Sequence, residues 1–253
     1  LYLTGLVYPS FNFDIHVIPD FPIPFNWTRA QIVDPHDSIP FAMGWVAVDE
    51  IGDYYFYDEY PEEPFERMAK TTMDFRDYAT VIRNKEGRDT IKHRIMDPNF
   101  GNKRYGNTGK TVKEELAAFG LNYNTSVTDD LTVGHHIVRE KLKYDTGRPM
   151  NTINKPKLYV LKRCRNIWVS LMRYGRKPLK NSEMKDNLNL DETYKHFCDI
   201  VRYACVAPEL KKIGPQVIDP IKREIKMIDY DELRNSNQPV IAGKAASGKY
   251  GLY

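Results

Sequence analysis

The chain has 253 residues, of which 42% are hydrophobic and 28% are charged, with a formal net charge of +3. This length is ample for one sizeable hydrophobic core with extensions. No apolar run approaches the roughly 20 residues that span a bilayer, so we expect a soluble protein without a membrane segment. The three cysteines are odd in number and lack paired zinc spacing, which favours a reducing compartment over a disulfide framework.

The first thirty residues are predicted to form an extended arm. Prolines recur there among aromatic residues, and proline disfavours a helix. The sequence begins with Leu1 instead of methionine and shows no signal peptide, so we expect a missing upstream portion and no secretion. We assign residues 1–30 to an arm or linker, 31–206 to the main domain and 207–253 to a C-terminal tail.

Strands are expected after the arm. Three segments are rich in β-branched and aromatic residues, at 29–34, 41–49 and 54–60. The turn at Gly52-Asp53 predicts a hairpin between the last two. A weakly helical region follows over 64–84, then a strand over 90–97 and a loop rich in Gly, Asn and Lys over 99–110.

Helices are expected in the second half. Thr111 and Glu114 have the spacing of a capping box, which predicts a helix that begins after Thr111 and ends near Gly120. Further helices are expected over 129–144, 165–174 and 191–206, with a short strand over 158–161. Strands followed by helices that alternate with further strands indicate an α/β fold, with a mixed sheet flanked by helices.

Two short runs share one design, Ile32-Val33-Asp34-Pro35 and Ile95-Met96-Asp97-Pro98. Each β-prone run ends in an aspartate before a proline, which places a carboxylate at the end of a strand. A third acid, Asp199, lies on the helix predicted over 191–206. Two carboxylates about 4 Å apart repel by about 4 kcal/mol at an effective dielectric of about 20, so such a cluster favours a divalent cation. Mg²⁺ or Mn²⁺ held by carboxylates is typical of phosphodiester hydrolysis.

Each of these acids also has a structural interpretation. Asp-Pro is a common start of a turn, so either motif alone is more often structural. On a helical wheel Asp199 lies opposite the apolar stripe, near His196 and Tyr203, which predicts a solvated side chain. Asp199 can therefore function only if this polar edge of its helix faces Asp34 and Asp97.

Basic residues are concentrated between Thr146 and Ser182, where ten Lys or Arg and no Asp or Glu interleave with aromatic residues. This pattern favours a nucleic-acid backbone, although a solvated face with counter-charges from elsewhere in the fold is the alternative. The candidate DNA-binding residues are Lys162, Arg163, Arg165, Arg173, Arg176, Lys177 and Lys180.

The sequence contains no convincing motif for ATP hydrolysis, zinc-dependent hydrolysis or acyl transfer. Residues 243–249 fit G-x-x-x-x-G-K, but Tyr250 stands where a P-loop needs Ser or Thr, so we expect no ATPase activity in this chain. His135-His136 lacks the H-E-x-x-H order of zinc hydrolases, and no G-x-S-x-G motif provides an acyl-transfer nucleophile.

Several motifs follow one another in a characteristic order along residues 1–205. They include Gly5-Leu6-Val7-Tyr8-Pro9, Val33-Asp34-Pro35-His36, Trp45-Val46-Ala47-Val48-Asp49, Arg94-Ile95-Met96-Asp97-Pro98 and His196-Phe197-Cys198-Asp199-Ile200-Val201-Arg202-Tyr203. In this order they resemble the C-terminal nuclease domain of the large terminase subunit of tailed bacteriophages, and the last motif is the most specific. The chain departs from the family at Lys195, where an aspartate often precedes the histidine.

The resemblance implies a ribonuclease H-like fold and two-metal cleavage of concatemeric viral double-stranded DNA during genome packaging. It implies Asp34, Asp97 and Asp199 as catalytic metal ligands for Mg²⁺ or Mn²⁺, with Glu59 and His196 as possible additional residues. An upstream ATPase domain, the portal and the small terminase subunit are the implied partners, in the host cell cytoplasm. Two alternatives stay open: another ribonuclease H-like nuclease such as a junction resolvase, or a non-catalytic DNA or portal docking module.

Overall fold

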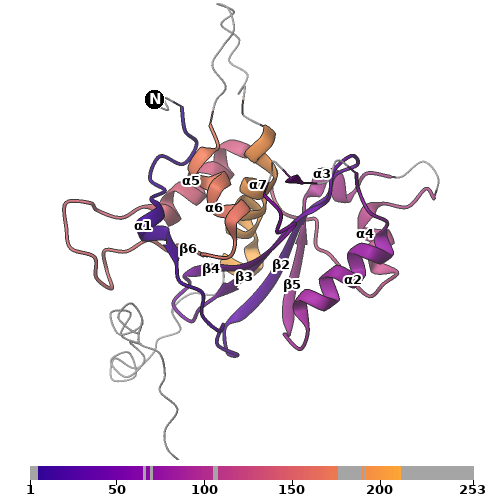
Figure 1. Cartoon of the computed structure of the whole chain (residues 1–253), viewed down its shortest axis with the longest axis horizontal. Coiled ribbons are helices and arrows are strands. Elements are labelled where there is room, and N and C mark those ends of the chain that lie inside the picture. The colour runs from indigo at the N-terminus through magenta and orange to yellow at the C-terminus, as the bar shows by residue number, and fades with distance from the viewer. Residues whose placement is uncertain are drawn as a thin grey trace, which may run out of the picture. The chain divides into compact units, whose positions relative to one another are not determined.

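A mixed sheet of six strands, in the order β1-β6-β4-β3-β2-β5, forms the centre of the fold (Figure 1). The computed structural model describes residues 5–64, 67–68, 71–104, 108–175, 190 and 192–211. The strands are β1 (Val17–Ile18), β2 (Thr28–Asp34), β3 (Ala42–Val48), β4 (Tyr54–Tyr60), β5 (Ile91–Met96) and β6 (Leu158–Leu161). The mixed α/β sheet expected from the sequence is thus confirmed.

Strands β2, β3 and β4 form an antiparallel meander, and the remaining strands join it in parallel. Strand β5 pairs with β2, β6 pairs with β4, and β1 pairs with β6 at the edge. Every residue of β3 is buried, as is all of β2 after its first residue. Strands that are buried along their whole length need a covering layer on both faces of the sheet.

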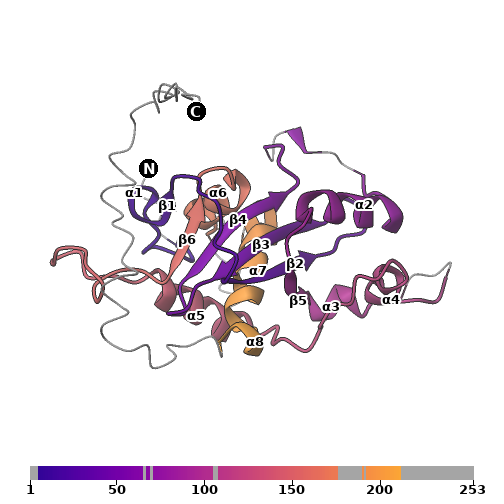
Figure 2. The same ribbon diagram turned by 90° about the horizontal axis from the view of Figure 1, so that it is seen from below.

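Helices provide these two layers. Their bounds are α1 (Phe13–His16), α2 (Phe75–Glu86), α3 (Pro98–Gly101), α4 (Val112–Ala117), α5 (Leu131–Leu142), α6 (Arg165–Arg173), α7 (Glu192–Val206) and α8 (Pro208–Lys211). Helices α5, α6 and α7 lie together on one face of the sheet, and α2 covers the other with α4 beside it (Figures 1 and 2). Within the described residues, no helix is long and apolar enough to cross a membrane.

Helix α7 lies directly on the sheet, and Gly44 of β3 makes this close approach possible. A Cβ atom at Gly44 would lie 2.5 Å from Cγ2 of Ile200. No real side chain tolerates that separation, so the absence of a side chain at Gly44 sets how near α7 comes to β2 and β3. The position of α7 matters because this helix carries Asp199.

Three short helices, α1, α3 and α8, lie where the sequence predicted none, and α8 falls in the expected C-terminal tail. Helix α1 interrupts the expected extended arm, because the side chain of Asn12 accepts a hydrogen bond from the backbone N–H of Asp14. Helix α3 occupies the start of the expected loop, because Asp97 caps it and Pro98 suits the first helical turn. Thr111 and Glu114 form the predicted capping box of α4.

Replacing Gly44 with Ala should push α7 away from β3 and lower the free energy of unfolding by about 1–3 kcal/mol, as overpacking usually does. Adding Ile200→Ala removes the clashing methyl group. The double variant should therefore lose less stability than the two single variants combined, measured by urea denaturation. Simple additivity would show that this contact does not set the helix position.

Candidate active site

Asp34 and Asp97 lie at the same edge of the sheet because β2 and β5 are parallel neighbours. Asp34 is the last residue of β2, and the backbone N–H of Asp97 donates to the carbonyl of Val33 at 3.0 Å. Both residues are buried, each 6% exposed. The strand-end placement expected from the two Asp-Pro motifs is therefore present.

One edge of α7 faces these strand ends. His196, Asp199 and Tyr203 are spaced by three and four residues, so they share a helix face. Nδ1 of His196 donates to Oδ2 of Asp34 at 2.6 Å, and the hydroxyl of Tyr203 donates to Oδ1 of Asp97. The structure thus brings the helix that carries Asp199 onto both strand-end acids.

The expectation of a solvated Asp199 is wrong, because this residue is buried, at 4% exposed. Helix α7 packs against the sheet on one side and against α5 and α6 on others, and every residue from Phe197 to Val206 is buried. Helical periodicity identified the apolar stripe correctly but could not show that other helices enclose the polar edge.

The acids influence one another electrostatically. Burial raises the pKa of Asp34, and the charge of Asp97 raises it further, against the hydrogen bond from His196. Burial also raises the pKa of Asp199 to about 6, with Arg202 opposing this and Asp34 adding to it. Burial alone would lower the pKa of His196, but its bond to Asp34 and the charge of Asp34 outweigh that and raise it.

The donor chemistry of this cluster suits a divalent cation. Carboxylate oxygens are preferred by Mg²⁺ and Mn²⁺, and a cation would relieve the repulsion between buried acids. Among the described residues, however, no three His, Cys, Asp or Glu side chains are arranged as ligands of one ion. Oδ1 of Asp199 accepts from Nε of Arg202 at 2.9 Å, while Asp97 accepts from Tyr203 and from the N-terminus of α3. Oδ1 of Asp97 accepts two bonds, from Asn99 and Tyr203, while Oδ2 of Asp97 accepts one, from the backbone N–H of Phe100. A carboxylate oxygen has two lone pairs, so Oδ2 of Asp97 retains capacity for a cation.

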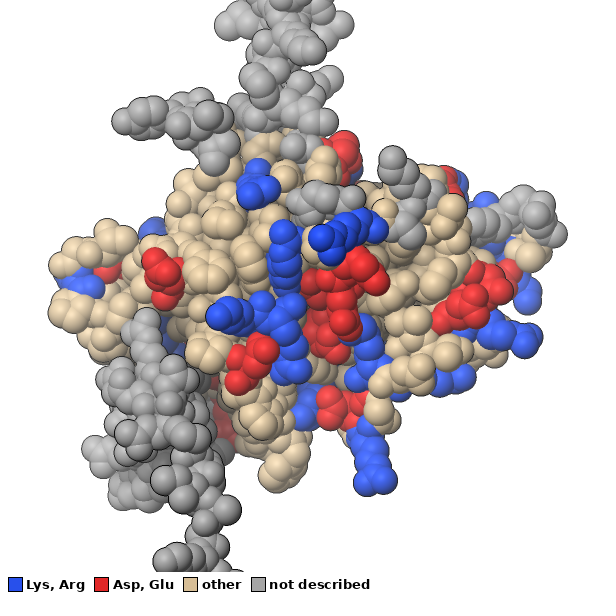
Figure 3. All heavy atoms as spheres, in the orientation of Figure 1, with Lys and Arg blue, Asp and Glu red and all other residues tan. Residues whose placement is uncertain are grey.

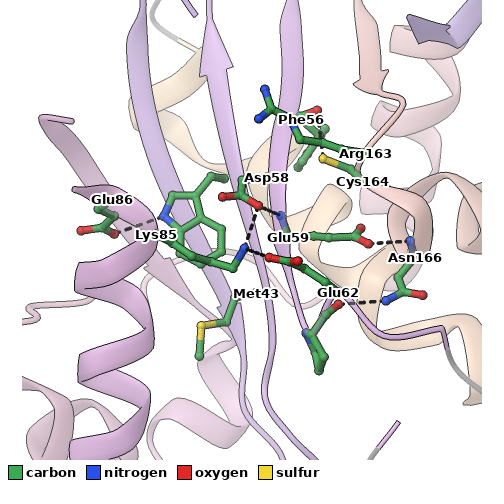
Figure 4. Close-up of polar contacts among 12 residues, drawn as sticks. Met43, Phe56, Asp58, Glu59, Glu62, Lys85, Glu86, Arg163, Cys164 and Asn166 are labelled. Atoms are coloured by element: carbon green, nitrogen blue, oxygen red, sulfur yellow. Dashed lines mark hydrogen bonds and ion pairs between the residues drawn. The ribbon is translucent and has the colours of Figure 1, made fainter. Parts of the chain in front are cut away.

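Glu59 has a different environment (Figure 4). Its carboxylate accepts the backbone N–H groups of Asn166 at 2.7 Å and Ile167 at 2.9 Å, in the first turn of α6. A buried carboxylate at a helix N-terminus satisfies free N–H groups and complements the helix dipole. Asn166 extends this junction by donating to the carbonyl of Pro61 at 2.9 Å. The structure therefore places Glu59 in a helix cap that joins β4 to α6.

Of the candidate DNA-binding residues, Arg165 and Arg173 lie on α6, and Lys162 and Arg163 lie just before it. Arg165 and Arg173, at its two ends, lie about 12 Å apart along the axis. Arg163 pairs with Asp20 at 3.7 Å, and Arg173 approaches the hydroxyl of Tyr194, two residues before His196, at 3.4 Å. Arg176, Lys177 and Lys180 fall outside the described residues. Figure 3 shows Lys and Arg side chains lying next to Asp and Glu side chains on one face.

Two residues of the site were missed by the sequence analysis. Arg202 pairs with Asp199, and its i, i+3 spacing on the same helix was an available signal. His36 lies beside His196, with ring centroids 5.0 Å apart, and only its nearness to Asp34 in the sequence suggested this.

Comparison with solved structures finds the same fold in bacteriophage large terminases. The large terminase of a thermophilic bacteriophage matches with a TM-score of 0.62 and 18% identity, over 81% of this chain and 46% of that chain. The P22 large terminase nuclease domain matches with a TM-score of 0.58 and 12% identity, over 83% of this chain and 97% of that chain.

The chain thus spans about half the length of the thermophilic phage terminase but nearly all of the P22 nuclease domain. No protein-family model matches the sequence, and no curated protein matches it significantly. The structural similarity confirms the expected ribonuclease H-like fold, a mixed sheet flanked by helices like that of terminase nuclease domains.

Glu59 predicts a pH dependence of stability. Burial raises its pKa to about 8, although the two N–H groups of α6 oppose this. The native state therefore retains a proton that the unfolded state releases, and the free energy of unfolding should fall as pH rises from about 5 to 8. Glu59→Gln stays neutral, so its thermal melts without metal should show a shallower slope than those of the parent. An unchanged slope would exclude Glu59 as a cause.

Proposed function

We propose that this chain is the nuclease domain of a large terminase, a metal-dependent endonuclease that cuts concatemeric viral double-stranded DNA during genome packaging. One observation carries the proposal: one edge of α7 contacts both strand-end acids. His196 is hydrogen-bonded to Asp34 and Tyr203 to Asp97, and Asp199 lies between His196 and Tyr203 along the helix. The similarity of the fold to the P22 large terminase nuclease domain supports it.

In this proposal Asp34, Asp97 and Asp199 hold two divalent cations, Mg²⁺ or Mn²⁺. When bound, the cations would activate a water and offset the charge that develops on the phosphodiester. His196 orients the carboxylate of Asp34 through its 2.6 Å hydrogen bond. Its second ring nitrogen would be a further possible metal ligand beside Asp34. Burial of the acids keeps bulk water from competing for their oxygens.

Basic residues would hold the DNA through its phosphates with little reading of bases. Arg173 is the best placed of them, because it contacts Tyr194 near the start of α7. Lys162, Arg163 and Arg165, near the N-terminus of α6, would make further contacts with the DNA backbone. Phosphate contacts of this kind position a duplex without selecting its sequence.

We further propose that this chain belongs to a longer large terminase subunit. The large terminase of the thermophilic bacteriophage, which has also been solved with ATP-gamma-S, is about twice as long as the part that this chain matches. An upstream ATPase domain would account for that remainder. The portal and the small terminase subunit would be further partners, and the site of action would be the host cell cytoplasm.

A non-catalytic docking module is the second candidate. It is favoured by the finding that no three potential ligands within the described ranges are arranged around one ion. In that case the acids would serve as turns and helix caps, as Asp97 does for α3. Intact DNA binding without any binding of Mn²⁺ in calorimetry would support this candidate.

Plasmid cleavage in Mg²⁺ or Mn²⁺ tests the nuclease directly. Asp34→Asn and Asp199→Asn should each reduce cleavage at least about 100-fold, since even outer-shell partners of a metal are worth 10- to 100-fold. Asp77→Asn is the matched control, because this acid is exposed on α2, on the other face of the sheet. Parental cutting by both site variants would contradict the assignment, and a preference for four-way junctions over linear duplex would indicate a resolvase.

A further inference from the structure

Arg202 is a fully charged side chain within the core, and only 2% of it is exposed. Charged residues are almost never buried to this extent unless they are paired. Its Nε donates to Oδ1 of Asp199 at 2.9 Å, and Nη1 has no hydrogen-bond partner among the described residues. The pairing therefore holds both side chains in place within a region of low dielectric.

Arg202 is also connected to a second acid. Its guanidinium lies 4.2 Å from the centre of the Tyr203 ring, and the hydroxyl of Tyr203 donates to Oδ1 of Asp97. One buried cation thus binds Asp199 directly and packs on the residue that holds Asp97. The two acids come from α7 and from the end of β5, so Arg202 connects separate elements of the site.

Helix α5 leaves room for this side chain at Gly134. A Cβ atom there would lie 2.5 Å from both Cγ and Cδ of Arg202. Glycine is unfavourable in a helix interior compared with alanine, and here it gives the arginine stem the space that it needs. The neighbouring His135 adds no second positive charge near neutral pH, because burial and then Arg202 and Arg139 lower its pKa to about 4.

We propose that Arg202 is a positioning residue for the metal site. It fixes the carboxylate of Asp199 through Oδ1, so that Oδ2 would be available to a divalent cation, and it packs against Tyr203, whose hydroxyl donates to Asp97. This inference rests on the proposed function, because it concerns the same acids. The planar guanidinium is required for both contacts, so lysine, although equally charged, should not replace it.

Two variants separate geometry from charge. Arg202→Lys keeps the charge but loses the planar group, and Gly134→Ala keeps the arginine but displaces its stem. Both should weaken Mn²⁺ binding about 10- to 100-fold in titration calorimetry of the whole chain, as losing an outer-shell partner does. Gly147→Ala, on the exposed loop between α5 and β6, is the control and should bind Mn²⁺ like the parent. Circular dichroism identifies the variants that remain folded.

The outcomes are distinct. Weakened Mn²⁺ binding in folded Gly134→Ala supports the inference even if Arg202→Lys fails to fold. Parental Mn²⁺ affinity in folded Gly134→Ala overturns it. A third variant, Arg202→Met, removes the charge altogether. Tighter Mn²⁺ binding by this variant also overturns the inference, because the arginine would then act only as a charge that competes with the metal. A parent chain that neither binds Mn²⁺ nor cuts DNA overturns the proposed function itself, and the inference with it.

Discussion

The carboxylates at the ends of β2 and β5 depend on one helix, α7, for their surroundings. Its polar edge supplies a histidine to Asp34, a tyrosine to Asp97 and a third acid, Asp199, and the three acids are buried. Burying an uncompensated charge is costly, so each of these acids needs a partner close by. The packing of α7 on the sheet thus determines whether three distant parts of the sequence can act as one site.

Each acid of the cluster has a partner that offsets part of its charge. Arg202 compensates Asp199, His196 compensates Asp34, and the N-terminus of α3 compensates Asp97. Each of these contacts occupies only part of the capacity of a carboxylate. A divalent cation could therefore bind these carboxylates while their hydrogen bonds stay in place. The carboxylates would then be held in position before the metal binds.

Much of the fold could be predicted from the sequence, because local patterns determine it. β4 and β6 have the predicted bounds, and the Thr111 capping box begins α4 where expected. The strand-end position of Asp34 and Asp97 also followed from local β propensity and the prolines. The burial of Asp199 did not, because it depends on α5 and α6 enclosing α7, which no helical wheel represents. The capping role of Glu59 was missed for the same reason, since it depends on a contact with a distant part of the chain. Arg202 is different, because its i, i+3 spacing from Asp199 was present in the sequence.

The catalytic roles of Asp34, Asp97 and Asp199 remain predictions, and diffraction from crystals soaked in Mn²⁺ tests them most directly. The account predicts anomalous density between these three carboxylates, with the ion pair between Asp199 and Arg202 still present. Density elsewhere in the molecule, or an empty cluster at saturating Mn²⁺, would contradict the account and leave the acids with the structural roles of turns and helix caps.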